Sequence, residues 1–259
     1  MVIAVKNVTK IFGKKRVLDN VSVRFPTGAL SAVVGAGGSG KTTLLRLLAG
    51  ELKADSGKVA AKRSALKAVS SENGSFFTGL KISDHCTVWT LLYPGFDTKL
   101  FRSLLAEAGI TEGSRLPNLS DASKKWLGIS FVIASNADIM IFDEPLQNLG
   151  PEMKTLLIRL FDGIVQKGKT VIAALQEIGE LEKSAAFVAA LNNGSLVLAG
   201  ETEKLLSSHR LLPGASTISP DYRVIGPVLD ERLAETTEEV GRSATLKEII
   251  SGYINGSSS

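Results

Sequence analysis

The eight residues 35–42, GAGGSGKT, restrict the fold of this 259-residue chain more than any other stretch of its sequence. They match the pattern G-x-x-x-x-G-K-[ST], in which glycines allow backbone N–H groups to surround an anion without side chains in the way. An apolar segment (27–35) ends in this loop and a segment with helical spacing of leucines (40–52) leaves it, which predicts a strand followed by a helix. The helix N-terminus adds positive potential at the same point. The motif therefore predicts a phosphate-binding loop, and a glycine-rich turn without a ligand is the alternative.

The residues of such a site have separate chemical roles. Lys41 would reach the β- and γ-phosphates of a nucleotide, and the hydroxyl of Thr42 would ligate Mg²⁺. In IMIFDEP (139–145), four apolar residues lead to an acidic pair. Asp143 would hold Mg²⁺ directly or through water, and Glu144 would orient and deprotonate the attacking water. The candidate phosphate-binding residues are Gly35, Ala36, Gly37, Gly38, Ser39, Gly40, Lys41, Thr42 and Thr43.

Further along the chain, strand patterns alternate with helical ones. This alternation predicts an α/β protein with a parallel sheet and a helical insertion before the strand that carries Asp143. The tail after about Leu206 changes composition, and its first part, 207–220, is typical of a loop. The predicted strands are 2–8, 21–25, 27–35, 66–71, 137–145 and 170–175, a hairpin over 187–200 with its turn at 192–194, and a strand at 222–228; the predicted helical segments are 40–52, 78–136, 151–168 and 245–254, and 255–259 is expected to be disordered.

Composition and charge narrow the class of protein. The net charge is +4, and the one basic run, KIFGKKR (10–16), is expected to be a solvated loop; a basic edge facing an anionic membrane and a nucleic-acid patch are the alternatives. A single cysteine, Cys86, excludes an internal disulfide and fits a reducing compartment, and we interpret it and His85 as structural. No secretory signal and no apolar run of membrane-spanning length stands out, so any action on a membrane is expected to require a partner.

Residues 2 to about 205 resemble the nucleotide-binding subunits of ATP-binding cassette (ABC) transporters, in the phosphate loop, in IMIFDEP and in the segments around them. The resemblance implies a P-loop NTPase (RecA-like) α/β core with an antiparallel β edge. It also implies a helical signature subdomain at about 78–136, within an ABC ATPase domain over 1–205. Residues 206–259 would form a small C-terminal extension. The implied ligands are ATP and Mg²⁺.

Two further residues take roles from this resemblance. Phe12 aligns with the aromatic residue that stacks on adenine, although a core phenylalanine on an edge strand is the alternative. Glu72, in SSENGSFF (70–77), aligns with the glutamine of the family's glutamine loop, and so becomes a candidate ligand of nucleotide and Mg²⁺. Some bacterial exporter ATPases carry glutamate there, and residues 91–105 are similar to their helical region. The resemblance therefore points to the exporter branch.

The segment LSDAS (119–123) aligns with the family's Leu-Ser-Gly-Gly-Gln signature, which clamps the γ-phosphate held by the other subunit of a dimer. Asp121 would place a carboxylate near a triphosphate, at a cost on the order of a few kcal/mol. Ser120 could still donate a hydrogen bond. The same residues also predict an ordinary helix start, with Ser120 as N-cap and Asp121 in the first turn, and the two interpretations are compatible.

Two more positions depart from the family. Gln176 replaces the switch histidine after the strand 170–175, and it can bond a γ-phosphate without carrying charge. Gly150 replaces the aspartate that couples the two subunits. The binding half of the site is thus intact, while the half offered to a partner is degenerate.

These features predict an ATPase subunit of a membrane transporter, coupling ATP hydrolysis to export of an unknown substrate. We expect it to lie on the cytoplasmic face of the cell membrane, bound to a transmembrane permease. Its other partner would be a second ATPase chain with an intact signature, and a homodimer would hydrolyse weakly. The alternatives are a nearly inactive structural or regulatory cassette, a non-transport cassette protein acting on ribosomes or DNA, and a metabolite kinase; no specific nucleic acid is expected as a partner.

Overall fold

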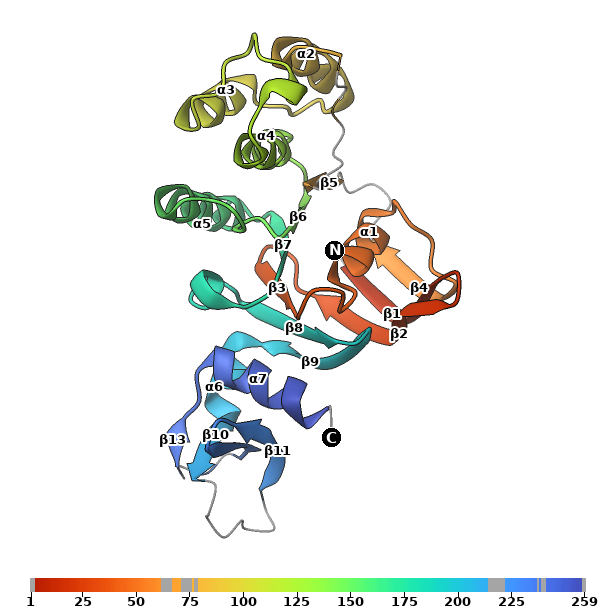
Figure 1. Cartoon of the computed structure of the whole chain (residues 1–259), viewed down its shortest axis with the longest axis vertical. Helices are drawn as coiled ribbons and strands as arrows, with labels where there is room; N and C mark the ends of the chain where they lie inside the picture. Colours follow the sequence, from red (N-terminus) through yellow and green to blue (C-terminus); the bar gives the residue numbers. More distant parts are fainter. Residues whose placement is uncertain are drawn as a thin grey trace.

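A computed structural model describes residues 3–61, 67–70, 76, 79–213, 222–236, 238 and 241–257. Within these ranges the strands form three sheets (Figure 1). The central sheet is parallel apart from the antiparallel hairpin at its edge. Its strands run in the order β5 (Lys67–Ser70), β6 (Ile139–Asp143), β7 (Thr170–Leu175), β3 (Leu30–Val34), β8 (Phe187–Asn192) and β9 (Ser195–Glu201). The predicted α/β class and parallel sheet are confirmed.

An antiparallel sheet packs beside the central one, as the resemblance implied. It consists of β2 (Lys15–Phe25), β1 (Ile3–Phe12) and β4 (Ser56–Ala61), in that order. The basic run 10–16 was expected to be a loop, which is wrong, because β1 extends to Phe12 and β2 begins at Lys15. Cross-strand pairing of Phe12 with Lys15 leaves only a two-residue turn, although the run is mostly exposed. Strand β4 forms at a stretch for which the sequence pattern predicted no strand.

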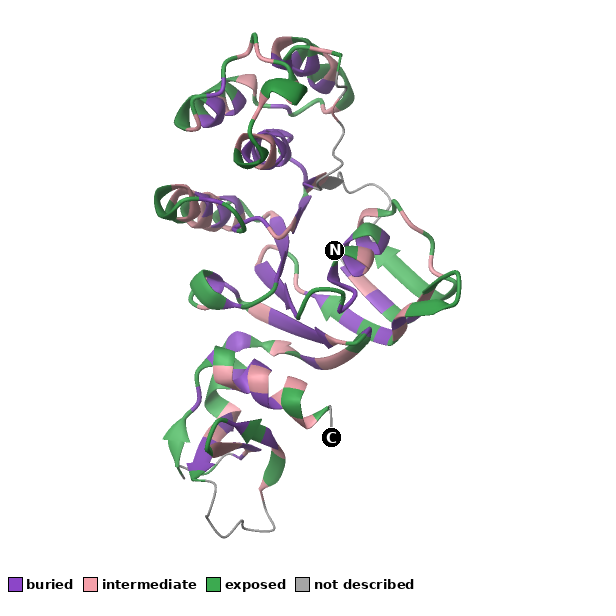
Figure 2. Ribbon diagram, viewed as in Figure 1, coloured by how far each residue is buried: buried purple, intermediate pink, exposed green. Residues whose placement is uncertain are grey.

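Strand alternation divides the buried side chains into two layers. On β3, Val33 packs with the first layer, which includes helix α1 (Lys41–Ala49) and the antiparallel sheet. Its neighbours Ala32 and Val34 face the second layer, which includes α5 (Pro151–Gln166) and the helical region. Successive residues of a strand point to opposite faces, so a strand buried on both faces has an unbroken apolar sequence. Figure 2 shows this purple centre with exposed residues around it.

The helical region contains α2 (Ile82–Leu92), α3 (Thr98–Glu107) and α4 (Asp121–Ala134), with a 3₁₀ turn at Leu116–Asn118. Its core is aromatic, and the ring centroids of Trp89 and Phe131 lie 4.5 Å apart. His85 and Cys86 are both buried, in agreement with their structural interpretation. Burial raises the pKa of the Cys86 thiol to about 11, which keeps it protonated and unreactive.

The C-terminal extension forms a third sheet and a helix. Its strands lie in the order β11 (Arg223–Val228), β12 (Glu231–Glu235), β10 (His209–Pro213) and β13 (Arg242–Ser243). The prediction of a loop over 207–220 was wrong at β10, because Leu211 and Leu212 are buried in this sheet. Helix α6 (Thr202–Ser208) crosses the predicted boundary at 205 and leads into the extension.

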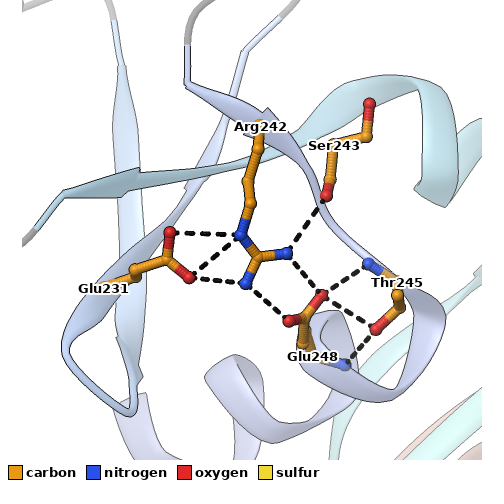
Figure 3. A network of polar contacts seen from close by, with 5 residues as sticks. All are labelled: Glu231, Arg242, Ser243, Thr245 and Glu248. Atoms are coloured by element: carbon orange, nitrogen blue, oxygen red, sulfur yellow. Dashed lines mark hydrogen bonds and ion pairs between the residues drawn. The ribbon is translucent and has the colours of Figure 1, made fainter.

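Helix α7 (Leu246–Gly256) covers this sheet and faces β8 and β9 of the central one (Figure 1). Thr245 and Glu248 form the predicted capping box. The helix continues through residues 255 and 256, which the sequence pattern assigned to a disordered end. Arg242 holds the helix start by ion pairs to Glu248 (2.7 Å) and to Glu231 (Figure 3). These contacts hold the pKa of Glu248 well below its usual range, at about 2.

Candidate nucleotide site

The loop 35–40 leaves β3 and ends where α1 begins. Gly35 N–H donates to the carbonyl oxygen of Leu175 on β7 at 3.2 Å, and Ser39 N–H donates to the Ala36 oxygen at 3.1 Å. Gly40 is the N-cap of α1, so the loop amides and the helix N-terminus lie together. This is the geometry that binds a phosphate through backbone donors and a helix dipole.

At two positions of the loop, 35 and 40, the surrounding atoms leave no room for a side chain, so only glycine fits. A Cβ at Gly35 would lie 2.3 Å from the Leu191 carbonyl oxygen. A Cβ at Gly40 would lie 2.8 Å from the Val17 oxygen, and its φ of 103° already disfavours any other residue. The loop is therefore packed against β2 and the end of β8, on the side away from its open glycines.

Lys41 and Glu144 meet inside the site. Lys41 is 5% exposed, and its Nζ lies 3.2 Å from Glu144 Oε1. The same ammonium group donates to the carbonyl oxygen of Gly35 at 2.7 Å and to that of Ala36 at 3.1 Å. Glu144 turns the chain at the end of β6 with a φ of 47°, and its N–H donates to Ala174 on β7 at 3.0 Å. The ammonium group and the candidate base are thus in direct contact.

Thr42 and Asp143 form the second pair. The Thr42 hydroxyl donates to Asp143 Oδ2 at 2.7 Å. The other carboxylate oxygen, Oδ1, is buried and has no hydrogen-bond partner within the described part of the chain. A hydroxyl beside an unsatisfied carboxylate oxygen suits Mg²⁺, which commonly takes one or two protein ligands and completes its shell with phosphate oxygens and water. These two residues therefore fit the ion that the sequence pattern implied.

Gln176 and Glu144 line one pocket of 340 Å³ at the ends of β6 and β7. Gln176 follows directly after β7 and is exposed, so its amide is free to face a ligand. Gln147 and Lys154 line the same pocket, and Lys154 makes an ion pair with Glu180 at 3.2 Å. The structure therefore brings together the candidate base and the residue at the switch position.

Phe12 is 46% exposed at the end of β1, which rules out the alternative that it is a core residue. The centroid of its ring is 5.3 Å from Lys10 Nζ, and its exposed part, a little under half of the residue surface, is open for stacking. Glu72 lies outside the described residues.

Ser120 lies at the N-terminus of α4, and Figure 1 draws this helix apart from α1, which begins at the phosphate loop. Its side chain accepts from Ser123 N–H at 3.2 Å, which confirms the predicted N-cap. The Asp121 side chain is 95% exposed and pairs with Lys124 at 3.2 Å. Gly150 is likewise exposed, as the N-cap of α5. These three positions are all available to a neighbouring molecule.

The family model for ABC transporters matches residues 18–147, which begin within β2 and end shortly after the acidic pair. The chain belongs to the ABC transporter family. It is 30% identical over 225 residues to the arginine transport ATP-binding protein ArtM of Bacillus subtilis (strain 168), covering 80% of this chain and 94% of ArtM. It is 28% identical over 222 residues to the glutamine transport ATP-binding protein GlnQ of Escherichia coli (strain K12), covering 78% and 92%.

A solved structure supports the fold. The ATP-binding cassette MJ0796, in a dimeric post-hydrolysis state bound to ADP and Pi, matches with a TM-score of 0.68 and 19% identity, over 78% of this chain and 99% of that one. This ABC protein is thus an ATP-binding subunit with ATP hydrolase activity of the ABC type, and its relatives act in transport. Among the helices of the described ranges, none combines the length and the apolar composition that a membrane-spanning helix needs.

Sequence reasoning missed the support beneath the loop. Gly194, in the β8–β9 turn, donates its N–H to the Ser39 oxygen at 3.1 Å and accepts from Asp19 N–H at 2.9 Å. The sequence predicted the turn but not what it touches, because these contacts join residues far apart in the chain.

Proposed function

We propose that this ABC subunit carries one complete catalytic half-site and offers a degenerate signature to its partner. The observation that carries the proposal is the contrast between the two sets of residues. Lys41 contacts Glu144 and Thr42 contacts Asp143 inside the fold, at 3.2 Å and 2.7 Å. Asp121, by contrast, directs its carboxylate into solvent with 95% of the side chain exposed.

In the proposed half-site, Mg·ATP binds with its phosphates on the amides of the loop 35–40 and on Lys41. Thr42 and Asp143 hold Mg²⁺, which would supply charge neutralisation to the phosphates. Glu144 accepts the proton of the attacking water, and Gln176 donates its amide to the γ-phosphate as a neutral replacement for a charged switch. Phe12 provides a stacking surface for the adenine, and Glu72 is assigned to the same ligand set by resemblance.

The degenerate half acts in a dimer. Ser120 retains a hydroxyl for the partner's γ-phosphate, but a carboxylate on Asp121 about 5 Å from a phosphate charge costs on the order of 3 kcal/mol at an effective dielectric constant of about 20. It also cancels the positive end of α4, which would otherwise attract the anion. With Gly150 at the coupling position as well, the reciprocal site is slow or silent. A second cassette with an intact signature completes the active site.

The subunit then works on the inner face of the cell membrane with a transmembrane permease, within a cassette domain over 1–205 followed by an extension over 206–259. Export is the proposed direction, and its support is the likeness of residues 91–105 to bacterial exporter ATPases. The alternative function is an ATP-binding structural or regulatory subunit with very little turnover, which the exposed Asp121 also favours.

Nucleotide-driven dimerisation tests the proposal without knowledge of the partner. We expect Glu144→Gln alone to stay monomeric with Mg·ATP in sedimentation, because two Asp121 carboxylates oppose closure. Glu144→Gln combined with Asp121→Gly should form a dimer, whereas Glu144→Gln combined with Asp84→Gly, another exposed acid in the first turn of a helix, should not. A dimer formed equally by Glu144→Gln alone would contradict the proposed degeneracy.

A further inference from the structure

The last turn of α7 is bonded to the β8–β9 turn. Asn192 Nδ2 donates to Ser257 Oγ at 2.9 Å and, at 3.4 Å, to the Ile254 carbonyl oxygen. Asn192 pairs with Ser195 across the hairpin, so only Asn193 and Gly194 form the loop, with φ values of 46° and 83°. Two positive φ values in a two-residue Asn-Gly loop make a tight turn with little freedom. The end of α7 is therefore attached to a rigid element.

The opposite side of this turn supports the phosphate loop. Gly194 N–H donates to the Ser39 carbonyl oxygen at 3.1 Å, and the Leu191 oxygen lies close enough to Gly35 to exclude a Cβ. Gly194 itself fits tightly, because a Cβ there would lie 2.6 Å from the Val17 oxygen. The turn thus contacts the loop near both of its ends, and movement of the turn moves backbone donors that face the phosphates.

The other end of α7 contacts the segment that follows the switch position. Leu246 N–H donates to Glu182 Oε1 at 2.8 Å, and Lys247 pairs with Glu177, the neighbour of Gln176, at 3.0 Å. The Lys247 pair is exposed, so we assign it little energy. Between these ends, Tyr253 OH bonds His209 Nε2 at 3.2 Å, which attaches the middle of the helix to the extension. One helix therefore joins the extension to both sides of the nucleotide site.

We propose that Asn192 is a positioning residue for the phosphate loop, and that docking of α7 on it sets the affinity of the loop for Mg·ATP. The inference rests on the proposed function, in which this loop is the ATP site. A loop whose amides are already arranged loses less conformational freedom on binding, so a held turn favours the ligand. The extension thereby acts as a regulatory unit, because docking of its helix α7 on the β8–β9 turn raises the affinity of the phosphate loop for Mg·ATP.

Calorimetric titration of full-length protein with Mg·ATP tests this. Removing the Asn192 to Ser257 bond by Asn192→Ala should weaken Mg·ATP binding by about fivefold, the size expected of one net hydrogen bond. Ser257→Ala should give a loss no larger than that of Asn192→Ala, which also removes the bond to the Ile254 oxygen. The double variant should lose no more than Asn192→Ala alone, because Asn192→Ala already removes the bond that Ser257→Ala removes. Asn255→Ala is the matched control, since its amide bonds to Pro227 within the extension at 3.1 Å, and it should bind like the parent.

If Asn192 only stabilised the fold, its replacement would lower the thermal midpoint without the non-additive losses of Mg·ATP affinity described above. We therefore expect unchanged kcat at saturating ATP, an unchanged thermal midpoint for Ser257→Ala, and faster amide hydrogen exchange over 36–41 in both single variants. Parental affinity and exchange in both would overturn the inference, as would strictly additive losses. If Asn192→Ala unfolds, Ser257→Ala, at an exposed helix end, decides alone. Lys41→Ala distinguishes failure of the proposed ATP site from failure of the coupling. If Lys41→Ala binds Mg·ATP like the parent, the proposed ATP site is wrong. Parental binding by Ser257→Ala overturns only the coupling between α7 and the phosphate loop.

Discussion

Lys41 Nζ lies 3.2 Å from Glu144 Oε1, so the cation assigned to the phosphates is paired with the carboxylate assigned to the attacking water. Both side chains are largely withdrawn from solvent, at 6% and 21% exposure. A nucleotide that draws Lys41 towards its phosphates would release Glu144 from this ion pair. Binding and activation of the base are therefore linked through a single contact.

This contact leads to a prediction for Glu144→Gln. Removal of the carboxylate abolishes proton acceptance, and kcat should fall by about 10²–10⁴-fold, the usual contribution of a general base. Mg·ATP affinity should not fall, because Lys41 loses a competitor for the phosphates. Glu152→Gln, an exposed neighbour in the first turn of α5, is the control and should leave both quantities unchanged. An unaltered steady-state rate in Glu144→Gln would remove Glu144 from its assigned role.

Thr42→Ala tests the Mg²⁺ assignment. The variant loses the hydroxyl that bonds Asp143 at 2.7 Å, and we expect the Mg²⁺-dependent part of ATP affinity to fall by about 10–100-fold, as for disturbed metal sites generally. ATP binding in the presence of EDTA should stay near the parental value. Thr42→Ser retains the hydroxyl and should behave like the parent. Equal Mg²⁺ dependence in Thr42→Ala and the parent would count against this pair as the ion's ligands.

Gly40 and Gly37 differ in what surrounds them, which predicts different stabilities. Gly40→Ala places a methyl 2.7 Å from the Leu18 side chain at a φ of 103°, and it should lower the free energy of unfolding by about 1–3 kcal/mol. Gly37→Ala meets nothing within 4 Å and should change it by less than about 0.5 kcal/mol. Urea denaturation of the two variants without nucleotide measures the difference. Equal stability would show that the contacts of Gly40 are unimportant.

The extension should be sensitive to acid through Glu248. Its ion pair with Arg242 and its capping bonds lower the folded-state pKa to about 2 (Figure 3). A depressed carboxyl pKa adds stability above the unfolded pKa of about 4.3, and this stability is lost as the pH falls towards 2. Glu248→Gln should therefore lose less stability than the parent between pH 5 and pH 3, in denaturation curves followed by circular dichroism. Parallel losses would contradict the assignment.

The fold was predictable where chemistry is local. The glycines and Lys41 specify a strand, a loop and a helix within one short segment, and the apolar run before Asp143 specifies a buried parallel strand. Ser120 and Thr245 are N-cap residues whose type and position in the sequence predicted the starts of α4 and α7. The motifs assigned Lys41 and Glu144 to one nucleotide site although about a hundred residues separate them, but the direct contact between the two side chains was not predicted.

The sequence-based predictions were wrong where tertiary contacts determine the local structure. Strand β10 lies in a stretch whose composition is typical of a loop, and it forms because Leu211 packs in a sheet with β12. The basic run 10–16 forms the end of a hairpin, because pairing between β1 and β2 orders these residues despite their charge. The sequence around Asn192 gave no indication that this turn contacts the phosphate loop, because the contact depends on how the β8–β9 hairpin packs against the distant segment between β3 and α1.

The central claim is that the loop 35–42 of this subunit binds Mg·ATP through its amides and Lys41. Isothermal titration of Mg·ATP into the purified chain, beside Lys41→Ala, tests it most directly. We predict saturable heat with one nucleotide per chain for the parent and at least about a tenfold weaker affinity for Lys41→Ala, since a charged contact to a phosphate is lost. No heat with the parent, or identical titrations for the two proteins, would contradict the account.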